Sequence, residues 1–302
     1  MLPWIAEQAV SAERAQACID EQFDDLAPCQ AEPLGAGWDN TAFLVNGEWV
    51  FRFPRRKLAA ELLQYELRVL PGLARRLPLP IPEPRWVGLP TPRFSWHFAG
   101  YAHLAGRTAC AAHLDENARV AAAEPLGQFL AALHAVGPAA AGRLGAPLDL
   151  LGRLDPARRV PQSQERLVQI EAWGLIPSMK PYQLLLDAAA FTRPAQSGAL
   201  VHGDLYVRHL LVDERQVPCG VIDWGDVHLG DPAVDLMIVF GFLPPAARPA
   251  FRRAYGPIDD ATLTLARFRA LYHAAILTMW GHSIGDANLV REGLYGLNGV
   301  LL

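Results

Sequence analysis

The chain is poor in cysteine and has no long apolar segment. Four of its 302 residues are cysteines, and they are scattered without a CxxC pair. This pattern argues against a disulfide scaffold or a zinc site and fits a reducing cytosol. No apolar run reaches a membrane-spanning length, and the N-terminus lacks the basic segment and apolar core of a signal peptide. We therefore expect a cytoplasmic protein with no membrane partner.

A strong excess of charge is also absent. The formal net charge is −4, charged residues make up 19% of the sequence and hydrophobic residues 51%. This balance gives no case for general nucleic-acid binding. The length and apolar content suffice for one large domain or two lobes. We expect a monomer that acts on a small molecule and has no nucleic-acid partner.

Three short apolar runs occupy the stretch from residue 199 to 222, and polar residues follow each of them. The runs are Ala199–His202, His209–Asp213 and Cys219–Ile222. Short apolar runs bounded by turn residues predict buried strands. If the three strands form one small sheet, Asp204, His209 and Asp223 lie together at its edge. Apolar walls with a few convergent polar groups are typical of an active site.

The three polar residues suit phosphoryl transfer, which needs a carboxylate to orient a hydroxyl and further ligands for a divalent cation. Asp204 occupies the position of the base in the kinase catalytic loop, and His209, five residues on, that of a metal-binding Asn. Asp223 follows a Val-Ile strand and precedes an aromatic residue and Gly, as the metal-binding acid of kinases does. A hairpin with acids at its turns is the simpler interpretation, but the combined order and spacing favour the catalytic one.

The motifs HGDLxxxxLL and GVIDWGDxxxGDPAxDL resemble those of the aminoglycoside phosphotransferase superfamily, which comprises small-molecule kinases. With His209 in place of the usual Asn, the chain is most similar in motif to aminoglycoside 2''-phosphotransferases and macrolide 2'-phosphotransferases. The resemblance implies ATP or GTP with Mg²⁺ as cofactors, Asp204 as the catalytic residue, and His209 and Asp223 as metal ligands. It also implies that Asp231 braces the catalytic loop.

Residues 32–56 predict a strand, a Gly-rich turn and a β-hairpin. The turn contains Gly35 and Gly37, and Asn46-Gly47 is a type I' hairpin signal between Thr41–Val45 and Trp49–Phe53. Backbone amides at Gly35 and Gly37 can cover nucleotide phosphates. An ordinary Gly-rich hairpin explains the same residues equally well, so this motif is weak evidence by itself.

Arg52 and Glu66 are charged residues within apolar patterns. Arg52 lies on the apolar strand of the hairpin, where kinases have a phosphate-binding Lys. Glu66 lies in the middle of the apolar stripe of a helix predicted over Ala59–Leu70. Because an unpaired buried carboxylate is costly, we expect Glu66 to pair with Arg52. The alternative is a solvent-facing Arg52 on an edge strand.

The predicted fold is α+β and protein-kinase-like, with a small antiparallel-sheet N-terminal lobe and a larger, mainly helical C-terminal lobe. We expect the nucleotide-binding lobe to cover residues 1–100, a hinge residues 101–106, and the catalytic and acceptor-binding lobe residues 107–302. We also expect a helix over residues 3–30 and a strand over Arg93–Gly100. By resemblance, backbone groups of Ala102 and Leu104 would contact the purine.

The predicted function is transfer of a nucleotide γ-phosphoryl group to a hydroxyl of an aminoglycoside- or macrolide-like acceptor. Residues 237–302 contain four acids and six arginines. This half of the acceptor lobe is not acidic and is rich in Trp, Tyr, Phe and Leu, which favours a bulkier, less charged acceptor such as a macrolide or an unknown metabolite. Two alternatives stay open: a metabolite kinase for a sugar, an amino alcohol or homoserine, and a non-catalytic nucleotide-binding pseudokinase. The His at position 209 keeps the pseudokinase in consideration.

Overall fold

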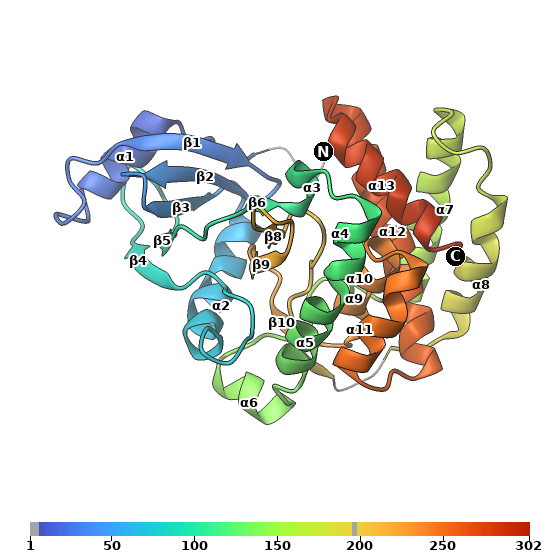
Figure 1. The fold of residues 1–302 in the computed structure, drawn as a ribbon. Coiled ribbons are helices and arrows are strands. Elements are labelled where there is room, and N and C mark those ends of the chain that lie inside the picture. The colour runs from blue at the N-terminus through green and yellow to red at the C-terminus, as the bar shows by residue number, and fades with distance from the viewer. Residues whose placement is uncertain (1–5, 195–197) are drawn as a thin grey trace. The chain divides into compact units, whose positions relative to one another are not determined.

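The computed structural model describes residues 6–194 and 198–302 (Figure 1). The chain forms two compact units. Residues 1–75, 81–104 and 224–226 belong to the first unit, and residues 76–80, 105–223 and 227–302 to the second. The first unit is built on an antiparallel sheet and the second is mainly helical, which confirms the predicted α+β class. The predicted lobe boundaries and the hinge over residues 101–106 stay a prediction.

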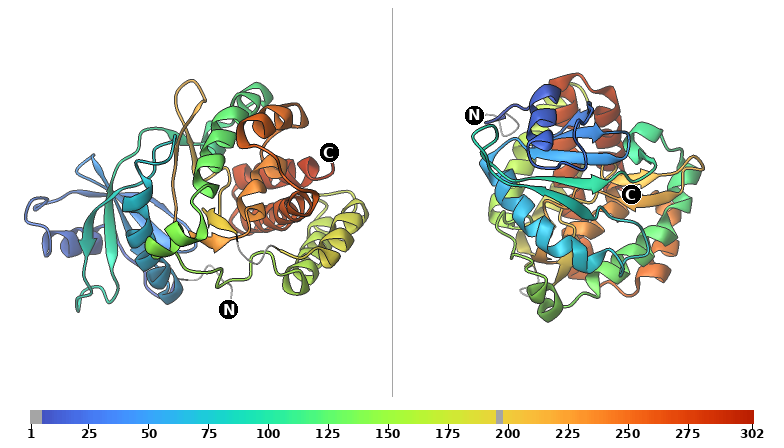
Figure 2. Two further views of the ribbon diagram at one scale, coloured as in Figure 1. Left: turned by 90° about the horizontal axis from the view of Figure 1, so that it is seen from below. Right: turned by 90° about the vertical axis from the view of Figure 1, so that its left-hand side faces the viewer.

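A five-stranded antiparallel sheet forms the centre of the first unit, with strand order β1-β2-β3-β5-β4 (Figure 1 and Figure 2). The strands are β1 (Ala31–Ala36), β2 (Asn40–Val45), β3 (Trp49–Pro54), β4 (Pro84–Gly88) and β5 (Phe98–Ala102). The predicted hairpin is confirmed, because β2 pairs with β3 across Asn46 and Gly47. These two residues have φ of 52° and 71°, the left-handed conformation that a type I' turn requires.

One face of this sheet buries a cluster of aromatic side chains. Phe53 stacks on Phe98 with ring centroids 4.5 Å apart, and Phe94 meets Phe53 edge to face at 5.3 Å. Phe51 and Phe43 complete the buried set. Alternation along β3 directs Phe51 and Phe53 to this face. Arg52 therefore projects from the opposite face, toward the side where it can meet the helix that follows.

The described residues of the first unit form the helices α1 (Ala12–Asp20) and α2 (Lys57–Leu73). The helix predicted over Ala59–Leu70 is confirmed as α2. The helix predicted over residues 3–30 is wrong in extent, because Ser11 caps α1 by accepting from the Arg14 amide and the helix ends at Asp20. Residues 3–5 of that prediction lie outside the described residues.

The strand predicted over Arg93–Gly100 is also wrong in extent. The observed strand β5 begins at Phe98, after a turn in which the Thr91 and Phe94 backbones bond to each other. The proline-rich sequence over residues 71–92 predicts an extended connector, but part of it forms strand β4. This is an edge strand, where its leading Pro84 is tolerated because the outer side of the strand needs no hydrogen-bond donor.

Short strands in the second unit form two separate small sheets. One has the order β6-β8-β9, from β6 (Arg107–Thr108), β8 (Leu210–Val212) and β9 (Pro218–Val221). The other pairs β7 (Ala199–Val201) with β10 (His228–Gly230). The prediction that the three apolar runs form one sheet is therefore wrong, since β7 finds its partner in residues 228–230.

Helices make up most of the second unit (Figure 1). The α-helices are α3 (Ala109–Ala112), α4 (Glu116–Ala121), α5 (Ala123–His134), α6 (Pro138–Arg143), α7 (Pro156–Ala172), α8 (Gln183–Phe191), α9 (Ala233–Leu236), α10 (Ile238–Gly241), α11 (Arg248–Tyr255), α12 (Asp260–Ile284) and α13 (Ala287–Gly299), and the 3-10 turns are η1 (Lys180–Tyr182) and η2 (Pro245–Ala247). The long helix α12 is buried along most of its length and packs against α13 and α7. Among the described residues, no helix is long and apolar enough to cross a membrane.

Candidate active site

The loops around β7, β8 and β9 bring Asp204, His209 and Asp223 together within the second unit. The His209 Nε2 atom lies 3.2 Å from Asp223 Oδ2, and its Nδ1 atom lies 3.6 Å from Asp204 Oδ2. Nδ1 also lies 2.8 Å from the Asp204 carbonyl oxygen, to which it donates. The Ile222 amide donates to the His209 carbonyl, which ties the two loops together. The predicted convergence of these residues is present although the predicted single sheet is not.

Asp235 holds the loop that carries Asp204. Its carboxylate accepts from the amides of His202 and Gly203 at 2.7 and 2.8 Å, and it lies 3.2 Å from His134 Nε2. The resemblance implied this bracing role for Asp231. The observed bonds to the loop amides come from Asp235, one helical turn later, while Asp231 accepts from the Ala233 amide at 2.8 Å. Asp231 thereby contributes to the start of the short helix α9, and its bracing of the loop stays a prediction.

His202 is an orienting residue inside this loop. Its Nδ1 accepts from the Asp204 amide at 3.2 Å, so its Nε2 carries the proton and donates to the Ile222 carbonyl at 3.0 Å. Burial lowers the pKa of His202, which keeps the ring neutral as both hydrogen bonds require. This ring therefore links the Asp204 loop to the segment just before Asp223.

Asp223 has a positive φ of 63°, a conformation that non-glycine residues rarely adopt. Such outliers persist where the surrounding structure enforces them, and they concentrate at functional sites. The side chain is 41% exposed, whereas that of His209 is 12% exposed. The strained backbone thus turns an accessible carboxylate toward the imidazole.

Asp223 offers a magnesium ion the carboxylate oxygen that it prefers, and His209 offers an imidazole nitrogen, which suits Mg²⁺ less well. Mg²⁺ typically takes one or two carboxylates at about 2.0–2.1 Å and leaves its other positions to phosphate and water. Adjacent ligands of such an octahedron are about 3 Å apart, which matches the 3.2 Å between His209 Nε2 and Asp223 Oδ2. The Asp204 carbonyl fixes the His209 tautomer, as outer partners of metal-binding histidines do. Residues 6–194 and 198–302 contain no cluster of three or more such side chains able to hold a metal unaided.

Charges around Asp204 control its protonation. Burial alone would raise the pKa of Asp204, but hydrogen bonding by His273 and the positive charges of His209 and Arg269 outweigh it and hold the pKa well below the ordinary 3.8. Burial opposes protonation of His209, yet the Asp223 carboxylate raises the pKa of this ring above its ordinary value. Asp204 is therefore ionised at neutral pH and able to orient a hydroxyl.

Two residues of α12 contact Asp204 and were not predicted. Arg269 Nη2 lies 3.8 Å and His273 Nε2 lies 3.5 Å from Asp204 Oδ1. Both side chains are largely buried, at 7% and 15% exposed. They are four residues apart, hence on one face of the helix. In the sequence, the signal that could have identified them was an arginine and a histidine four positions apart in the mostly buried part of this helix.

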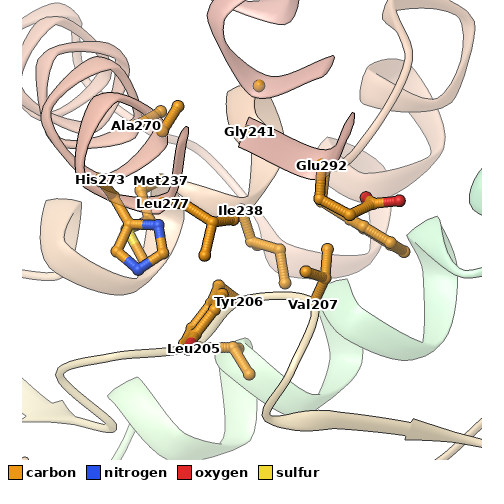
Figure 3. Close-up of a pocket in the computed structure, with 13 residues that line it drawn as sticks. Leu205, Tyr206, Val207, Met237, Ile238, Gly241, Ala270, His273, Leu277 and Glu292 are labelled. Carbon is orange, nitrogen blue, oxygen red and sulfur yellow. The ribbon is translucent and has the colours of Figure 1, made fainter. Parts of the chain in front are cut away.

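A narrow cavity of about 350 Å³, counting its mouth, adjoins this face of α12. Figure 3 shows His273 and Tyr206 among its lining residues, with Leu277, Met237 and Ile238 supplying apolar wall. Burial raises the pKa of Tyr206, so its hydroxyl stays protonated. The cavity offers an apolar compartment next to the groups that surround Asp204.

Within the first unit, β3 and α2 bring Arg52 and Glu66 into a buried ion pair. Arg52 Nη1 donates to both carboxylate oxygens of Glu66, at 2.9 and 3.1 Å, and the Tyr101 hydroxyl donates to Glu66 at 2.8 Å. The Glu66 side chain is 1% exposed and that of Arg52 11%. The geometry matches the pairing expected from the apolar stripe of α2. Tyr101 was not anticipated, because its neighbourhood depends on the pairing of β5 with β3.

The remaining predicted residues lie at the ends of strands in the first unit. Gly35 lies in β1, and a methyl group placed there would touch no other atom. The Gly37 amide donates to the Asn40 carbonyl at 2.9 Å, so it already has a partner in the turn. Ala102 ends β5 and Leu104 follows it without regular structure. Phosphate and purine contacts by these four residues stay predictions.

The family model described as "APH: Phosphotransferase enzyme family" matches residues 30–271. A curated protein of Bacillus subtilis (strain 168), the uncharacterized protein YcbJ, is 26% identical over 208 residues. That alignment covers 64% of this chain and 63% of the relative, so it spans less than two thirds of the relative's length.

Solved phosphotransferase structures share the fold over nearly the whole chain. The GDP complex of aminoglycoside 2'-phosphotransferase-IIIa is 24% identical with a TM-score of 0.69, covering 97% of this chain and 99% of that one. The GDP and kanamycin complex of APH(2")-IIIa is 25% identical with a TM-score of 0.67, covering 95% and 97%. Macrolide 2'-phosphotransferase MphH from Brachybacterium faecium is 25% identical with a TM-score of 0.55, covering 89% and 92%.

Proposed function

Since the chain belongs to the phosphotransferase enzyme family, we propose that it transfers the γ-phosphoryl group of a nucleoside triphosphate to a hydroxyl group of a small molecule. The observation that carries this proposal is the convergence of Asp204, His209 and Asp223 in the second unit. An ionised carboxylate beside a two-ligand cation site is the arrangement that phosphoryl transfer uses. Relatives with the same fold have been solved with GDP, with ADP and with kanamycin.

In the proposed reaction, Asp204 accepts a hydrogen bond from the acceptor hydroxyl and takes its proton as the new bond forms. The hydroxyl oxygen bonds to the γ-phosphorus while the bond from that phosphorus to the β–γ bridging oxygen breaks. The products are a phosphate monoester and a nucleoside diphosphate. Most of the acceleration comes from positioning and from charge stabilisation. The low pKa of Asp204 suits it to orient the hydroxyl.

His209 and Asp223 would hold a magnesium ion, which supplies positive charge against the phosphate oxygens when bound. His209 is kept in the required tautomer by the Asp204 carbonyl, and His202 links the Asp204 loop to the Ile222 carbonyl just before Asp223. Arg52 would contact the nucleotide phosphates, with Glu66 and Tyr101 fixing its guanidinium. Gly35, Gly37, Ala102 and Leu104 are the further residues proposed to contact the nucleotide.

We propose ATP or GTP as donor, since relatives are described with GDP, ADP and ATP.

We further propose that the protein is a cytoplasmic monomer. All four cysteines are free thiols, as expected in a reducing compartment. The proposed lobes are a nucleotide-binding lobe up to about residue 100, a hinge over residues 101–106, and a catalytic and acceptor-binding lobe after it.

The test is a phosphoryl-transfer assay with both nucleotides, with and without Mg²⁺, against a panel of alcohols. We expect transfer or slow nucleotide hydrolysis that requires Mg²⁺ and falls in Asp223→Asn. The exposed-face substitution Asp25→Asn serves as control, because Asp25 lies on the surface of the first unit. Nucleotide binding without transfer or hydrolysis in any combination would contradict the enzyme and favour a pseudokinase.

A further inference from the structure

A group of arginines surrounds Tyr272 on the same side of α12 as Arg269. The guanidinium carbons of Arg166, Arg159 and Arg269 lie 4.6, 5.1 and 5.4 Å from the centre of the Tyr272 ring. We call these three residues the arginine cluster. They come from α7 and α12, which pack against each other (Figure 1). Arg153, just before α7, lies nearby and is paired with Asp149 at 2.6 Å. Burial lowers the pKa of Arg269, the Asp204 carboxylate raises it, and the charges of Arg153 and Arg159 lower it further.

The arginine cluster has little negative charge to balance it. Arg159 donates to the Gly152 carbonyl at 2.9 Å and to the Tyr272 hydroxyl at 2.7 Å, which are neutral groups. In the described part of the chain, neither Arg159 nor Arg166 has a carboxylate within 4.0 Å. Among the residues that the structure describes, the arginine cluster forms a carboxylate ion pair only between Arg269 and Asp204, at 3.8 Å.

Arg269 has unused hydrogen-bonding capacity. The residue is 6% exposed, and its Nε atom is fully shielded without a hydrogen-bond partner among residues 6–194 and 198–302. Its contact with Asp204 is too long for a hydrogen bond, and no other described residue accepts a hydrogen bond from it. Leaving buried charged donors unsatisfied is costly, so the surplus indicates a ligand. The planar guanidinium matches a carboxylate or phosphate group, which it binds bidentately.

We propose that the acceptor is an anionic alcohol whose carboxylate or phosphate group binds Arg269 while its hydroxyl lies at Asp204. This inference rests on the proposed function. The 3.8 Å between Arg269 and Asp204 requires the acid group and the reacting hydroxyl to be few bonds apart. The apolar cavity on the His273 side is narrow, so an apolar part of the acceptor that enters it must be small. A polycation would face the arginine cluster and be repelled.

The bond changes remain those of hydroxyl phosphorylation. The γ-phosphoryl group passes to the hydroxyl oxygen, the proton goes to Asp204, and the nucleoside diphosphate leaves. The acid group of the acceptor takes no part in bond making. Arg269 is thus a specificity-determining residue, and its removal is expected to act on acceptor KM more than on kcat.

The experiment compares matched acceptors that differ in charge. Glycerate is paired with glyceramide, 3-hydroxybutyrate with 3-hydroxybutyramide, and glycerol 3-phosphate with glycerol, and kanamycin is the polycation. Comparing the two carboxylate pairs with the phosphate pair shows which acid group the protein binds. The enzymes are the unaltered protein, Arg269→Gln, Arg269→Lys and the control Arg253→Gln, which removes an exposed positive charge from α11.

We expect the unaltered protein to prefer the anionic member of at least one pair. Arg269→Gln should lower that preference about 10-fold to 100-fold, the value of a hydrogen bond to a charged group, mainly through KM. Arg269→Lys should keep part of the preference for the anionic acceptor, and the control Arg253→Gln should keep all of it. Preference for the neutral member or for kanamycin, or an anion preference that survives Arg269→Gln, would overturn the proposal while leaving the kinase function intact.

A binding measurement separates this inference from catalysis. Calorimetry with the same acids and amides, in the presence of a non-hydrolysable nucleotide, needs no turnover. Binding of an acid that is lost in Arg269→Gln supports the anion site even if no acceptor is phosphorylated. Absence of acid binding in the unaltered protein overturns it. Failure of the kinase function shows separately, as nucleotide that is bound but neither hydrolysed nor transferred in the Mg²⁺-dependent assay.

Discussion

At the scale of single residues, the buried ion pair of Arg52 with Glu66 has two separable roles. It satisfies a carboxylate that is 1% exposed. Under the proposed function, it also positions a guanidinium for the nucleotide phosphates. Arg52→Met should destabilise the protein by about 3–5 kcal/mol, because one charge of a buried pair is left without its partner. The double variant Arg52→Met/Glu66→Met should regain most of that loss, since an apolar pair of similar size replaces it.

Urea unfolding and nucleotide titration on the same samples separate the roles of this pair. We expect the double variant to recover stability while its nucleotide affinity stays as low as that of Arg52→Met. If nucleotide affinity returns together with stability, Arg52 acts only through folding and the proposed phosphate contact is wrong.

The buried carboxyl group of Asp235 predicts how the stability of the protein depends on pH. Burial would raise the pKa of Asp235, but hydrogen bonds from His134 and the loop amides lower it below the ordinary 3.8. A carboxyl with a depressed folded-state pKa stabilises the protein above its unfolded-state pKa. That stabilisation is lost as pH falls through the lower folded-state value. Asp235→Asn should therefore cost about 1.5–3 kcal/mol at neutral pH, and the difference from the unaltered protein should shrink below about pH 4.

Urea midpoints measured across this pH range check the Asp235 prediction. The matched control is Asp25→Asn, an exposed carboxyl whose removal should change stability little at any pH. A difference between Asp235→Asn and the unaltered protein that stays constant down to the lowest pH would show that the charge of Asp235 is not what holds the loop.

At the scale of elements, the packing of α12 against α13 depends on glycine. A methyl group at Gly293 of α13 would lie 2.3 Å from Thr278 Oγ1 and 2.7 Å from the Thr278 backbone nitrogen. Gly293→Ala should destabilise the protein by about 1–3 kcal/mol through overpacking. Gly142→Ala in α6, where the methyl meets nothing within 4 Å, should be neutral or slightly stabilising because alanine favours helix. Thermal unfolding of both variants is the measurement, and equal melting temperatures would contradict the close approach.

Elements with a strong local signal could be predicted from sequence, and those defined by distant partners could not. The apolar stripe of α2 and the Asn46-Gly47 turn each encode their own structure. Strand β4 exists because β5 pairs with it, and its proline-rich start indicated a connector. The helix α1 is shorter than its apolar pattern, because Ser11 caps it and the stripe continues into a loop packed on the sheet.

The residues of the candidate site divide in the same way, into those predictable from local sequence and those placed by distant partners. Asp204, His209 and Asp223 could be predicted because kinase-like chemistry fixes their order and spacing along the chain. Arg269 and His273 lie more than sixty positions beyond Asp204, and nothing in their local pattern says which loop α12 faces. The hydrogen bonds from the loop amides to Asp235 likewise depend on where the first turn of α9 points.

At the scale of the whole molecule, the anionic-acceptor proposal makes a prediction about cells. Expression of the chain in a susceptible bacterium should leave kanamycin susceptibility unchanged, because the arginine cluster disfavours a polycation beside Asp204. A strain expressing Asp204→Asn at the same level is the control for effects of expression. Kanamycin resistance that requires Asp204 would support the kinase and contradict the anionic acceptor.

The account as a whole depends on Asp204 acting on the acceptor hydroxyl and not on nucleotide binding. The most direct measurement compares the unaltered protein with Asp204→Asn for kcat with the best acceptor of the panel and for nucleotide dissociation constant. We predict a kcat about 10²-fold to 10⁴-fold lower, as for the loss of a general base, with nucleotide affinity nearly unchanged. A variant that keeps its kcat, or that remains folded but loses nucleotide binding, would contradict the account.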